Sequence, residues 1–283
     1  MAAPNVSTTA ATKLVYQYDE SARTHLTRLH AVWRLSDLSQ TESELFKAAV
    51  AAHDDISSCY VLQTEETIFY VQGGGQPFDT GYMTVNNTKV RIEAVRYDSH
   101  GQVLHLAHTS DEIAAHFSAG DMVEQHIDGE RRDVNSRTHT AGHIVGLAVR
   151  RMVENHRDLD VTELKASHYF DACFVEFKGL IDGKYKAEIQ AQASKYVNEA
   201  LPIKLYWYRP DELSSTNVIT AEGMPIVSGA DGKVRVVDII GAGAYPCGGT
   251  HVPDTSLVGS IVVRNIKRQK GNTKVSYAIE ATS

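Results

Sequence analysis

The stretch Ser136–His156, SRTHTAGHIVGLAVRRMVENH, decides the fold of the second half of this chain. Its apolar residues recur three and four positions apart, which predicts a helix that packs one face on a core. Asn135 or Ser136 is expected to cap the start of this helix. Gly142 and Gly146 lie inside it, where each glycine costs about 1 kcal/mol relative to alanine. We therefore expect another backbone or a substrate to pass close to both glycines.

The same helix carries two histidines, His139 and His143, which point the same way because they lie four residues apart. About a hundred residues later, Cys247 and His251 have the same spacing within the glycine-rich turn CGGTH. Taken alone, either pair is more often a packing or surface feature than a metal site. Together they offer one thiolate and three imidazoles, which suit Zn²⁺ better than Mg²⁺ or Ca²⁺. The two motifs predict one zinc ion per chain.

A third motif, QGGGQPFDTG at Gln72–Gly81, follows a predicted strand. It lacks the following helix and the Gly-Lys-Ser/Thr of a nucleotide P-loop. Glycines alone would make a flexible hairpin loop, but Gln76, Pro77 and Asp79 give this loop a defined shape. Backbone amides exposed in such a loop can hold a phosphate or a ribose.

The composition is that of an ordinary globular protein, with 42% hydrophobic and 22% charged residues among 283. A chain of this length can hold one large or two modest domains. The formal net charge of −7 argues against a protein that coats nucleic acid through a broad basic field. A local contact with one end of an RNA is compatible with that charge.

The cysteines and the apolar segments indicate the compartment. Only three cysteines occur, Cys59, Cys173 and Cys247, too few and too scattered for a disulfide framework, so a reducing compartment is expected. No apolar run approaches the roughly 18 residues of a membrane span, and the first residues lack the charged and apolar regions of a signal peptide. We expect a cytoplasmic protein without a membrane partner.

Two domains and a tail are expected along the chain. Residues 1–12 are small and polar, which predicts a disordered tail. Residues 13–120 hold closely spaced strand patterns, with Asn86-Asn87 at a hairpin turn, and these predict a small antiparallel β-barrel. The polar stretch 119–133 has the character of a boundary. Residues 121–283 interleave helices and strands without a regular β-α-β repeat, so the fold class expected is α+β.

The individual elements follow from the same patterns. In the first domain we expect a short helix at 42–53 and strands at 60–62, 67–71, 82–85, 89–92 and 103–107. In the second we expect, after the long helix, a strand at 169–177, a helix at 184–200 and strands at 203–209, 234–240, 258–267 and 273–280.

In this order, the motifs GGGQPFDTG, HxxxH and CGGTHV closely resemble those of the alanyl-tRNA editing proteins of the AlaX type. These are freestanding relatives of the editing domain of alanyl-tRNA synthetase. The resemblance covers about residues 13–283 and implies a small β-barrel-like domain followed by an α+β editing domain. It implies a zinc-dependent hydrolase that deacylates mischarged tRNA, chiefly seryl-tRNA(Ala) and also glycyl-tRNA(Ala). No aminoacylation domain fits in this chain, so such a protein is expected to act in trans.

The resemblance also assigns site residues by position. The zinc ligands of the family fall on His139, His143, Cys247 and His251. The glycine-rich loop that approaches the active site and the tRNA 3′ end falls on Gly73, Gly74, Gly75 and Gln76. Thr250, inside the second ligand motif, is expected to face the substrate amino acid and to contact the serine hydroxyl.

Two departures from the family pattern bear on specificity. The Pro-Glu that often precedes the glycines is Val71-Gln72 here, and the segment 163–167 lacks the glutamine that synthetase domains usually carry there. The strand ending Glu176-Phe177 matches the family. We expect the chemistry to be retained, while the amino acid and the tRNA stay open between seryl-tRNA(Ala) and seryl-tRNA(Thr).

Zinc in such a site has two possible roles. It can lower the pKa of a water molecule toward 7 and direct it at the ester, or it can hold the amino group of the substrate. Four permanent protein ligands would make the site closed and structural, whereas catalysis needs an open or labile position. His251, at the end of its turn, is expected to be the labile ligand.

Contact with tRNA is expected at the densest basic cluster of this acidic chain. Its members are Arg264, Lys267, Arg268, Lys270 and Lys274, and Arg131 and Arg132 are weaker candidates. A solvated surface hairpin explains the cluster equally well.

Two other functions are compatible with part of the pattern. A zinc peptidase would carry His-Glu-x-x-His, but the residues between His139 and His143 are Thr, Ala and Gly, without a carboxylate. A non-catalytic tRNA-binding or RNA-binding module with structural zinc remains the alternative to an enzyme. The sequence does not indicate an oligomeric state.

Overall fold

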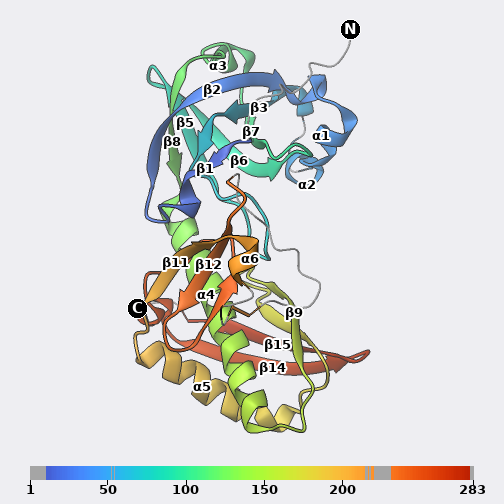
Figure 1. Ribbon diagram of the computed structural model, residues 1–283. Coiled ribbons are helices and arrows are strands. Elements are labelled where there is room, and N and C mark those ends of the chain that lie inside the picture. Colours follow the sequence, from blue (N-terminus) through green and yellow to red (C-terminus); the bar gives the residue numbers. More distant parts are fainter. Residues whose placement is uncertain are drawn as a thin grey trace. The chain divides into compact units, whose positions relative to one another are not determined.

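In the computed structural model, six antiparallel strands of the first half of the chain close into a barrel (Figure 1). They are joined in the order β2-β3-β7-β6-β5-β8. Their bounds are β2 Thr24–Arg34, β3 Cys59–Thr64, β5 Gly81–Val85, β6 Thr88–Tyr97, β7 Val103–His108 and β8 Met122–Ile127. Closure pairs every strand on both sides and so leaves no exposed sheet edge. The predicted α+β fold with a small antiparallel barrel is confirmed.

The hairpin between β5 and β6 turns at the asparagines named from the sequence. Asn86 and Asn87 have φ of 45° and 68°, and Val85 pairs with Thr88 across the turn. Asparagine tolerates this left-handed backbone, and two such residues make the type I′ turn that matches the twist of a hairpin.

Strand β8 lies inside the stretch 119–133 that was expected to be a boundary loop. Gln125 hides the strand pattern, because this polar side chain is fully buried. Its Oε1 accepts from the backbone N–H of Ile68 (2.9 Å), and its Nε2 donates to the carbonyl oxygen of Glu66 (3.0 Å). A polar residue with satisfied hydrogen bonds therefore occupies a core position.

The segment 67–71 was expected to be a strand, and that prediction is wrong for most of its length. Only Thr67 belongs to a strand, β4 (Glu66–Thr67), which pairs in parallel with β1 (Lys13–Leu14). Beyond it the backbone is buried and irregular, and the N–H of Tyr70 donates to Asp79 Oδ2 (2.7 Å). The connections between the barrel strands contain three short helices, α1 Gln40–Glu44, α2 Lys47–Val50 and α3 Asp111–Ala114.

The long helix α4 spans Gly129–Asn155, so it begins seven residues before the expected start at Ser136. Asn135 and Ser136, predicted as caps, are instead buried inside it. The missed first turn contains Arg132, which is fully buried and donates from Nε to Asp79 Oδ2 (2.9 Å). Because this turn contains the charged residue of a buried ion pair, its sequence is as polar as that of a linker.

Helix α4 packs its apolar face on a four-stranded sheet with the order β14-β15-β10-β9. The strands are β9 Thr162–Ser167, β10 Phe174–Lys178, β14 Ile261–Gln269 and β15 Asn272–Ile279. Helix α5 (Lys186–Asn198) joins the same core through Ile189 and Ala193. The strand expected at 169–177 is thus confined to its second half.

A second sheet in this part of the chain has the order β11-β12-β13. Its strands are β11 Ile203–Tyr208, β12 Val234–Ile239 and β13 Gly243–Pro246, and α6 (Pro210–Leu213) follows β11. Short 3₁₀ helices lie at Val15–Gln17, Leu35–Asp37, Ile56–Ser58, Gly183–Tyr185 and Thr255–Val258. The end of β13 leads directly into the CGGTH motif.

The structure describes residues 11–51, 53, 55–213, 216, 218–219 and 231–280. They form two units: one within Met1–Gln72 and Pro77–Arg132, the other within Gly73–Gln76 and Asp133–Ser283. The predicted domain bounds, 13–120 and 121–283, stay predictions. Residues 1–10 of the predicted tail lie outside the described residues, and Thr12 is buried with its hydroxyl donating to Gln102 Oε1 (3.1 Å). Among the described helices none is long and apolar enough to cross a membrane.

Candidate metal centre

The four ligand residues predicted from the sequence converge in the second unit. One ligand atom from each of His139, His143, Cys247 and His251 lies within 4.8 Å of the others. The distances from Cys247 Sγ are 3.4 Å to His139 Nε2 and 3.7 Å to His251 Nε2. A tetrahedral zinc ion with ordinary bond lengths would hold sulfur and nitrogen about 3.6 Å apart. The donor set therefore fits zinc in both chemistry and spacing.

The protonation of these side chains also suits a metal. Burial, and then the neighbouring imidazoles, hold the pKa of His139 and His143 well below the usual value, so both rings are neutral. Burial alone would raise the pKa of the Cys247 thiol, but His251 and the Arg235 guanidinium bring it below its usual value. His143 Nδ1 is buried without a hydrogen-bond partner among the described residues. A buried nitrogen of this kind requires a partner such as a metal ion.

Arg235, on β12, holds the CGGTH turn in place. Its Nη1 donates to the carbonyl oxygens of Cys247 (2.7 Å) and Gly249 (2.8 Å), and the Cys247 N–H donates back to the Arg235 carbonyl (3.0 Å). A Cβ on Gly249 would lie 2.8 Å from Gln76 Oε1 and would overlap the His139 ring. The second glycine of the motif is thus required by close packing.

Gln76, at the end of the glycine loop, orients the first ligand. Its Oε1 accepts from the backbone N–H of Thr250 (3.0 Å), which fixes the orientation of the amide. The same oxygen lies 2.6 Å from His139 Nδ1, so Nδ1 must carry the proton and donate. His139 Nε2 is then the nitrogen with a free lone pair, and it faces Cys247. Such a partner fixes both the tautomer and the ring position of a metal-bound histidine.

The glycine loop itself is a tight turn in the second unit. Gly73 and Gln76 bond through their backbones (3.3 and 2.9 Å), and Gly74 and Gly75 have φ of 53° and 80°. The Gly75 carbonyl accepts from the His168 N–H (2.9 Å), and a Cβ there would clash with the backbone of Ala166. Gly73 and Gly74 are exposed, whereas Gln76 is buried. A contact of this loop with the tRNA 3′ end stays a prediction.

The two glycines of α4 make room for buried side chains of other elements. A Cβ on Gly142 would overlap the His168 ring and lie 2.7 Å from the Tyr277 hydroxyl. A Cβ on Gly146 would lie 2.7 Å from Glu163 Oε2 and 2.9 Å from the Tyr245 hydroxyl. The expectation was another backbone or a substrate at both glycines, whereas the atoms that the structure places there belong to side chains distant in the sequence.

His168 supports the first ligand from the side opposite to its motif. Its ring stacks on His139 with 4.3 Å between centroids. The Tyr277 hydroxyl donates to the Thr138 carbonyl (2.9 Å), so its oxygen accepts from His168 Nδ1 (2.8 Å). His168 is therefore the neutral Nδ1–H tautomer, and burial lowers its pKa to about 3.

Thr250 lies fully buried beside the ligands. Its hydroxyl oxygen accepts from Gln76 Nε2 (2.9 Å) and is bonded to the Ser136 hydroxyl (2.8 Å). Two of its three hydrogen-bonding positions are thus used by the protein. Its contact with a substrate hydroxyl stays a prediction.

Comparison with known proteins places this geometry in context. A model of the threonyl and alanyl tRNA synthetase second additional domain matches residues 234–275, which include Cys247 and His251. A model of class II (A) tRNA synthetases matches residues 7–131. The alanine–tRNA ligase of Methanosphaera stadtmanae is 30% identical over 257 residues, which are 87% of this chain and 27% of the ligase. The alanyl-tRNA editing protein AlaX-L of Pyrococcus horikoshii is 28% identical over 214 residues, 75% of this chain and 50% of that protein.

The chain is a relative of the alanyl-tRNA editing proteins. The resemblance predicted from the three motifs is confirmed, and it extends to the corresponding part of alanine–tRNA ligases. The chain spans about a quarter of the length of these ligases and half of AlaX-L.

The basic residues predicted to touch tRNA lie along the β14–β15 hairpin of this AlaX relative. All four of the assigned residues are exposed, namely Arg264, Lys267, Arg268 and Lys270. Lys270 and Gly271 form the turn, with φ of 51° and 83°, and Lys267 lies opposite Lys274 across the strands. Like charges placed opposite each other repel, which an anionic partner would relieve. Arg132, a weaker candidate, is wrong for this role because it is buried against Asp79.

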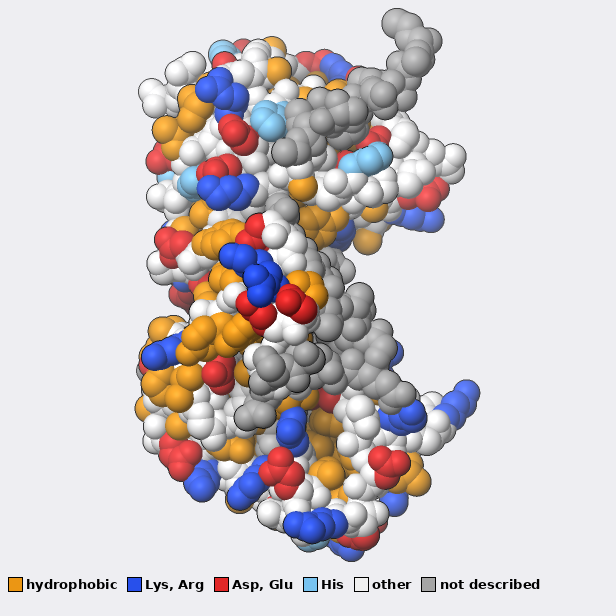
Figure 2. Space-filling view, in the orientation of Figure 1, with side chains coloured by type: hydrophobic (Ala, Val, Ile, Leu, Met, Phe, Trp, Pro, Cys, Tyr) orange, Lys and Arg blue, Asp and Glu red, His pale blue; other side chains and the backbone are white. Residues whose placement is uncertain are grey.

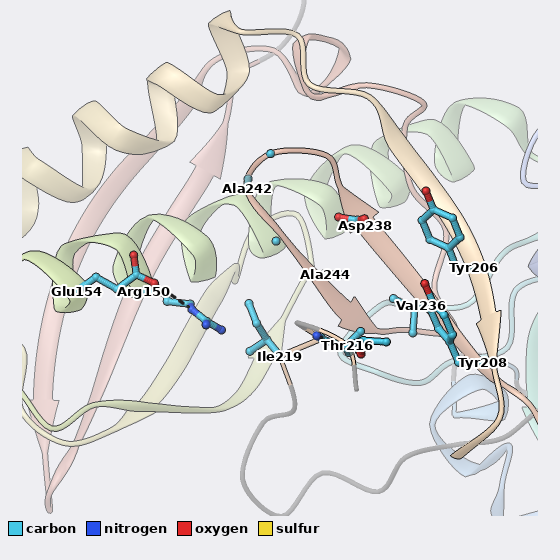
Figure 3. Close-up of a pocket in the computed structure, with 13 residues that line it drawn as sticks. Arg150, Glu154, Tyr206, Tyr208, Thr216, Ile219, Val236, Asp238, Ala242 and Ala244 are labelled. Carbon is cyan, nitrogen blue, oxygen red and sulfur yellow. Dashed lines mark hydrogen bonds and ion pairs between the residues drawn. The ribbon is translucent and has the colours of Figure 1, made fainter. Parts of the chain in front are cut away.

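Two adjoining cavities lie in the second unit. The larger, about 800 Å³, has Tyr206 and Tyr208 on one side and Arg150 on the other (Figure 3). The smaller, about 260 Å³, shares Arg150 and Ile219 with it. Tyr245 lines the smaller cavity and also packs edge-on against His143, with 4.7 Å between ring centroids. Sequence patterns gave no signal for either cavity.

Proposed function

We propose that this protein hydrolyses the ester of mischarged tRNA, with seryl-tRNA(Ala) as the main substrate and glycyl-tRNA(Ala) as a second. The observation that carries the proposal is the convergence of three imidazoles and one thiolate within 4.8 Å. It occurs in a chain related to a protein named for alanyl-tRNA editing.

One zinc ion would be held by His139, His143, Cys247 and His251. When bound there, zinc supplies a positive charge that can acidify a water molecule or hold the amino group of the substrate. The protein groups keep the ligands ready for it: Gln76 directs His139 Nε2 toward Cys247, and Arg235 fixes the turn that carries Cys247. His251, the last residue of its motif, is proposed as the ligand that opens a position, since a catalytic site needs one.

Selection against correctly charged alanine requires a polar partner for the serine hydroxyl. A site built to bond a hydroxyl rejects an analogue without one by a large factor. Thr250 is the proposed partner, through the third hydrogen-bonding position of its hydroxyl. Glycyl-tRNA would be accepted because its side chain is smaller.

The basic hairpin, defined by Arg264, Lys267, Arg268 and Lys270, is the proposed contact with tRNA phosphates. On the face shown in Figure 2, Lys and Arg side chains are interspersed with Asp and Glu, as the net charge of −7 implies. Reversal of Lys267 and Lys270 to Glu should raise KM and flatten its dependence on salt. Lys184→Glu, at another exposed site of the same unit, is the matched control. If the salt dependence of KM is unchanged, the hairpin does not contact tRNA phosphates.

A deacylation assay with seryl-tRNA(Ala), glycyl-tRNA(Ala), seryl-tRNA(Thr) and a peptide panel tests the proposal. Release of serine from seryl-tRNA(Ala), together with slower release of glycine from glycyl-tRNA(Ala), supports it, and release from seryl-tRNA(Thr) would change the tRNA assigned. A protein that binds tRNA but releases no amino acid would be the RNA-binding module with structural zinc. Peptide cleavage would point to a peptidase.

A further inference from the structure

The smaller cavity beside His143 is apolar except at one end. Its walls include the apolar side chains Val149, Val153, Val161, Phe177 and Ile219. The polar end holds Glu163, which reaches in from β9, and Tyr245, from β13. The Tyr245 hydroxyl donates to Glu163 Oε2 at 3.1 Å. A carboxyl group in such a wall is unusual, because burial of a charge is costly without a partner.

Among the residues that the structure describes, none places a cation on Glu163 in this cavity. Arg150 also lines the cavity, but its Nε is ion-paired with Glu154 at 3.4 Å. Tyr245 offers Glu163 a hydroxyl donor and no positive charge. Burial raises the pKa of Glu163 to about 7, and the Tyr245 hydrogen bond only partly offsets this. The carboxyl group is therefore in a position to gain from a positively charged ligand.

The cavity adjoins the metal ligands. Gly146 lies three residues after His143 on α4. Because it has no side chain, Glu163 and Tyr245 can pack against the helix at this point. The Tyr245 ring forms a wall common to the cavity and to His143, at 4.7 Å between centroids. The larger cavity of Figure 3 shares Arg150 and Ile219 with this one, so the aminoacylated end of a tRNA could reach Glu163 through it.

We propose that this cavity, and not the zinc ion, receives the α-ammonium group of the aminoacyl ester, with the Glu163 carboxylate as its acceptor and Tyr245 as the residue that positions the carboxylate. The inference rests on the proposed deacylase function. Every aminoacyl ester carries this ammonium group, and a charge-assisted hydrogen bond to a half-buried carboxylate in a cavity is strong. A cavity of about 260 Å³ suits a small aminoacyl group.

The test compares seryl-tRNA(Ala) with its α-hydroxy ester, which is made by treating the charged tRNA with nitrous acid. This exchange replaces the ammonium group with a hydroxyl and adds no bulk. For Glu163→Gln loaded with zinc to the wild-type content, we expect kcat/KM for seryl-tRNA(Ala) to fall about thirtyfold or more, as for loss of a buried charge partner. The α-hydroxy ester should change less than about twofold, since it makes no such pair.

Equal loss on the two esters, or no loss on either, would overturn the subsite and leave the deacylase function standing. A wild-type protein that hydrolyses neither ester would overturn both. Tyr245→Phe keeps the carboxylate and removes its donor, so it should reduce the preference for the ammonium ester without abolishing it. This second variant decides the matter if Glu163→Gln fails to fold.

Glu176→Gln is the matched control. Glu176 is a buried carboxylate on the neighbouring strand β10, paired with Lys165 (3.6 Å) and Lys274 (3.8 Å). Its neutralisation should affect both esters alike. A loss of ammonium preference in this variant too would mean a general effect of charge and would contradict a specific role of Glu163.

Discussion

The two histidines that α4 contributes to the ligand cluster have different surroundings. His139 is held on every side: Gln76 bonds its Nδ1 (2.6 Å), and its ring stacks on His168, which is bonded to Tyr277. His143 has a buried Nδ1 without a described partner and packs against Tyr245. We call the surroundings of His139 the closed side, because they fix this residue before any metal or substrate binds. We call the surroundings of His143 the open side, because polar groups there are incompletely hydrogen-bonded. A metal ion or a substrate can form the missing bonds.

The same contrast extends to the buried pairs behind the glycines. Beside Gly142, the His168–Tyr277 pair ends in the Thr138 carbonyl, so each proton has a defined place. Beside Gly146, Glu163 has one donor and opens on a cavity. A site that must hold a metal and accept a substrate needs both kinds of environment.

The largest effect is expected from removing Cys247, whose sulfur lies closest to His139 and His251. Cys247→Ala should lose zinc and deacylation together, with activity reduced more than about a hundredfold, because ligand loss exceeds the effect of losing an outer partner. Zinc content by metal analysis and release of serine from seryl-tRNA(Ala) measure the two. Cys59→Ala, a buried cysteine in the barrel, should change neither. Wild-type activity in a zinc-free Cys247→Ala protein would sink the metal-dependent mechanism.

Neutralising Glu163 should show how much its charge destabilises the folded protein. Its folded pKa is about 7 against an ordinary value of 4.5, so the folded protein binds the extra proton between these values. The contribution of Glu163 to the free energy of unfolding therefore falls as pH rises from 4.5 through 7. Glu163→Gln removes this penalty, so its stability relative to wild type should rise by up to about 3 kcal/mol between pH 4 and pH 8.

Urea unfolding of both proteins at pH 4, 6 and 8 measures this difference. The subtraction cancels the titration of every other group that the mutation leaves unchanged. A difference that does not depend on pH would show that Glu163 has the same pKa in the folded and unfolded protein.

Alanine at the two glycines of α4 should separate the closed side from the open side. At Gly142 a methyl group meets the rigid, fully bonded His168 and Tyr277, which should cost about 2 kcal/mol through overpacking. At Gly146 it meets the end of the flexible Glu163 side chain next to a cavity, and the gain in helix propensity of about 1 kcal/mol should largely offset the contact. Thermal or urea unfolding compares the two. Equal destabilisation would mean that the two sides are packed alike.

Much of this architecture was predictable from local patterns. The Asn86-Asn87 turn and the apolar spacing of α4 led to the barrel and to the helix, because both signals lie within a few residues. Strand β8 and the first turn of α4 were missed because Gln125 and Arg132 are buried polar residues. Their hydrogen-bond partners lie more than 50 residues away, so no local pattern reveals that these side chains face inward.

The ligands were predictable for the same reason, since each pair has a fixed spacing of four. The residues that tune them were not. Glu163 lies on β9 and His168 directly after it, whereas Tyr245 and Tyr277 come from β13 and β15, so the pairs meet only in the folded chain. The two glycines of α4 marked their places, yet a glycine states only that something is close. Gln76 was predicted as part of a loop that approaches the active site and the tRNA 3′ end, but the burial of its side chain against His139 had no local signal.

The smallest effect is expected at Gln76, whose Oε1 accepts from His139 Nδ1 and from the Thr250 N–H. Gln76→Met keeps the length of the side chain and removes the acceptor of His139 Nδ1–H, so zinc affinity should fall about tenfold to a hundredfold. Gln76→Glu keeps an acceptor and should restore most of it. Competition with a chromogenic chelator measures affinity, and the spectrum of the cobalt-substituted protein reports the ligand geometry. If Met and Glu bind zinc equally well, the stacked His168 suffices to hold His139 and the Gln76 bond only closes the loop; if Met alone is weak, the acceptor sets the tautomer.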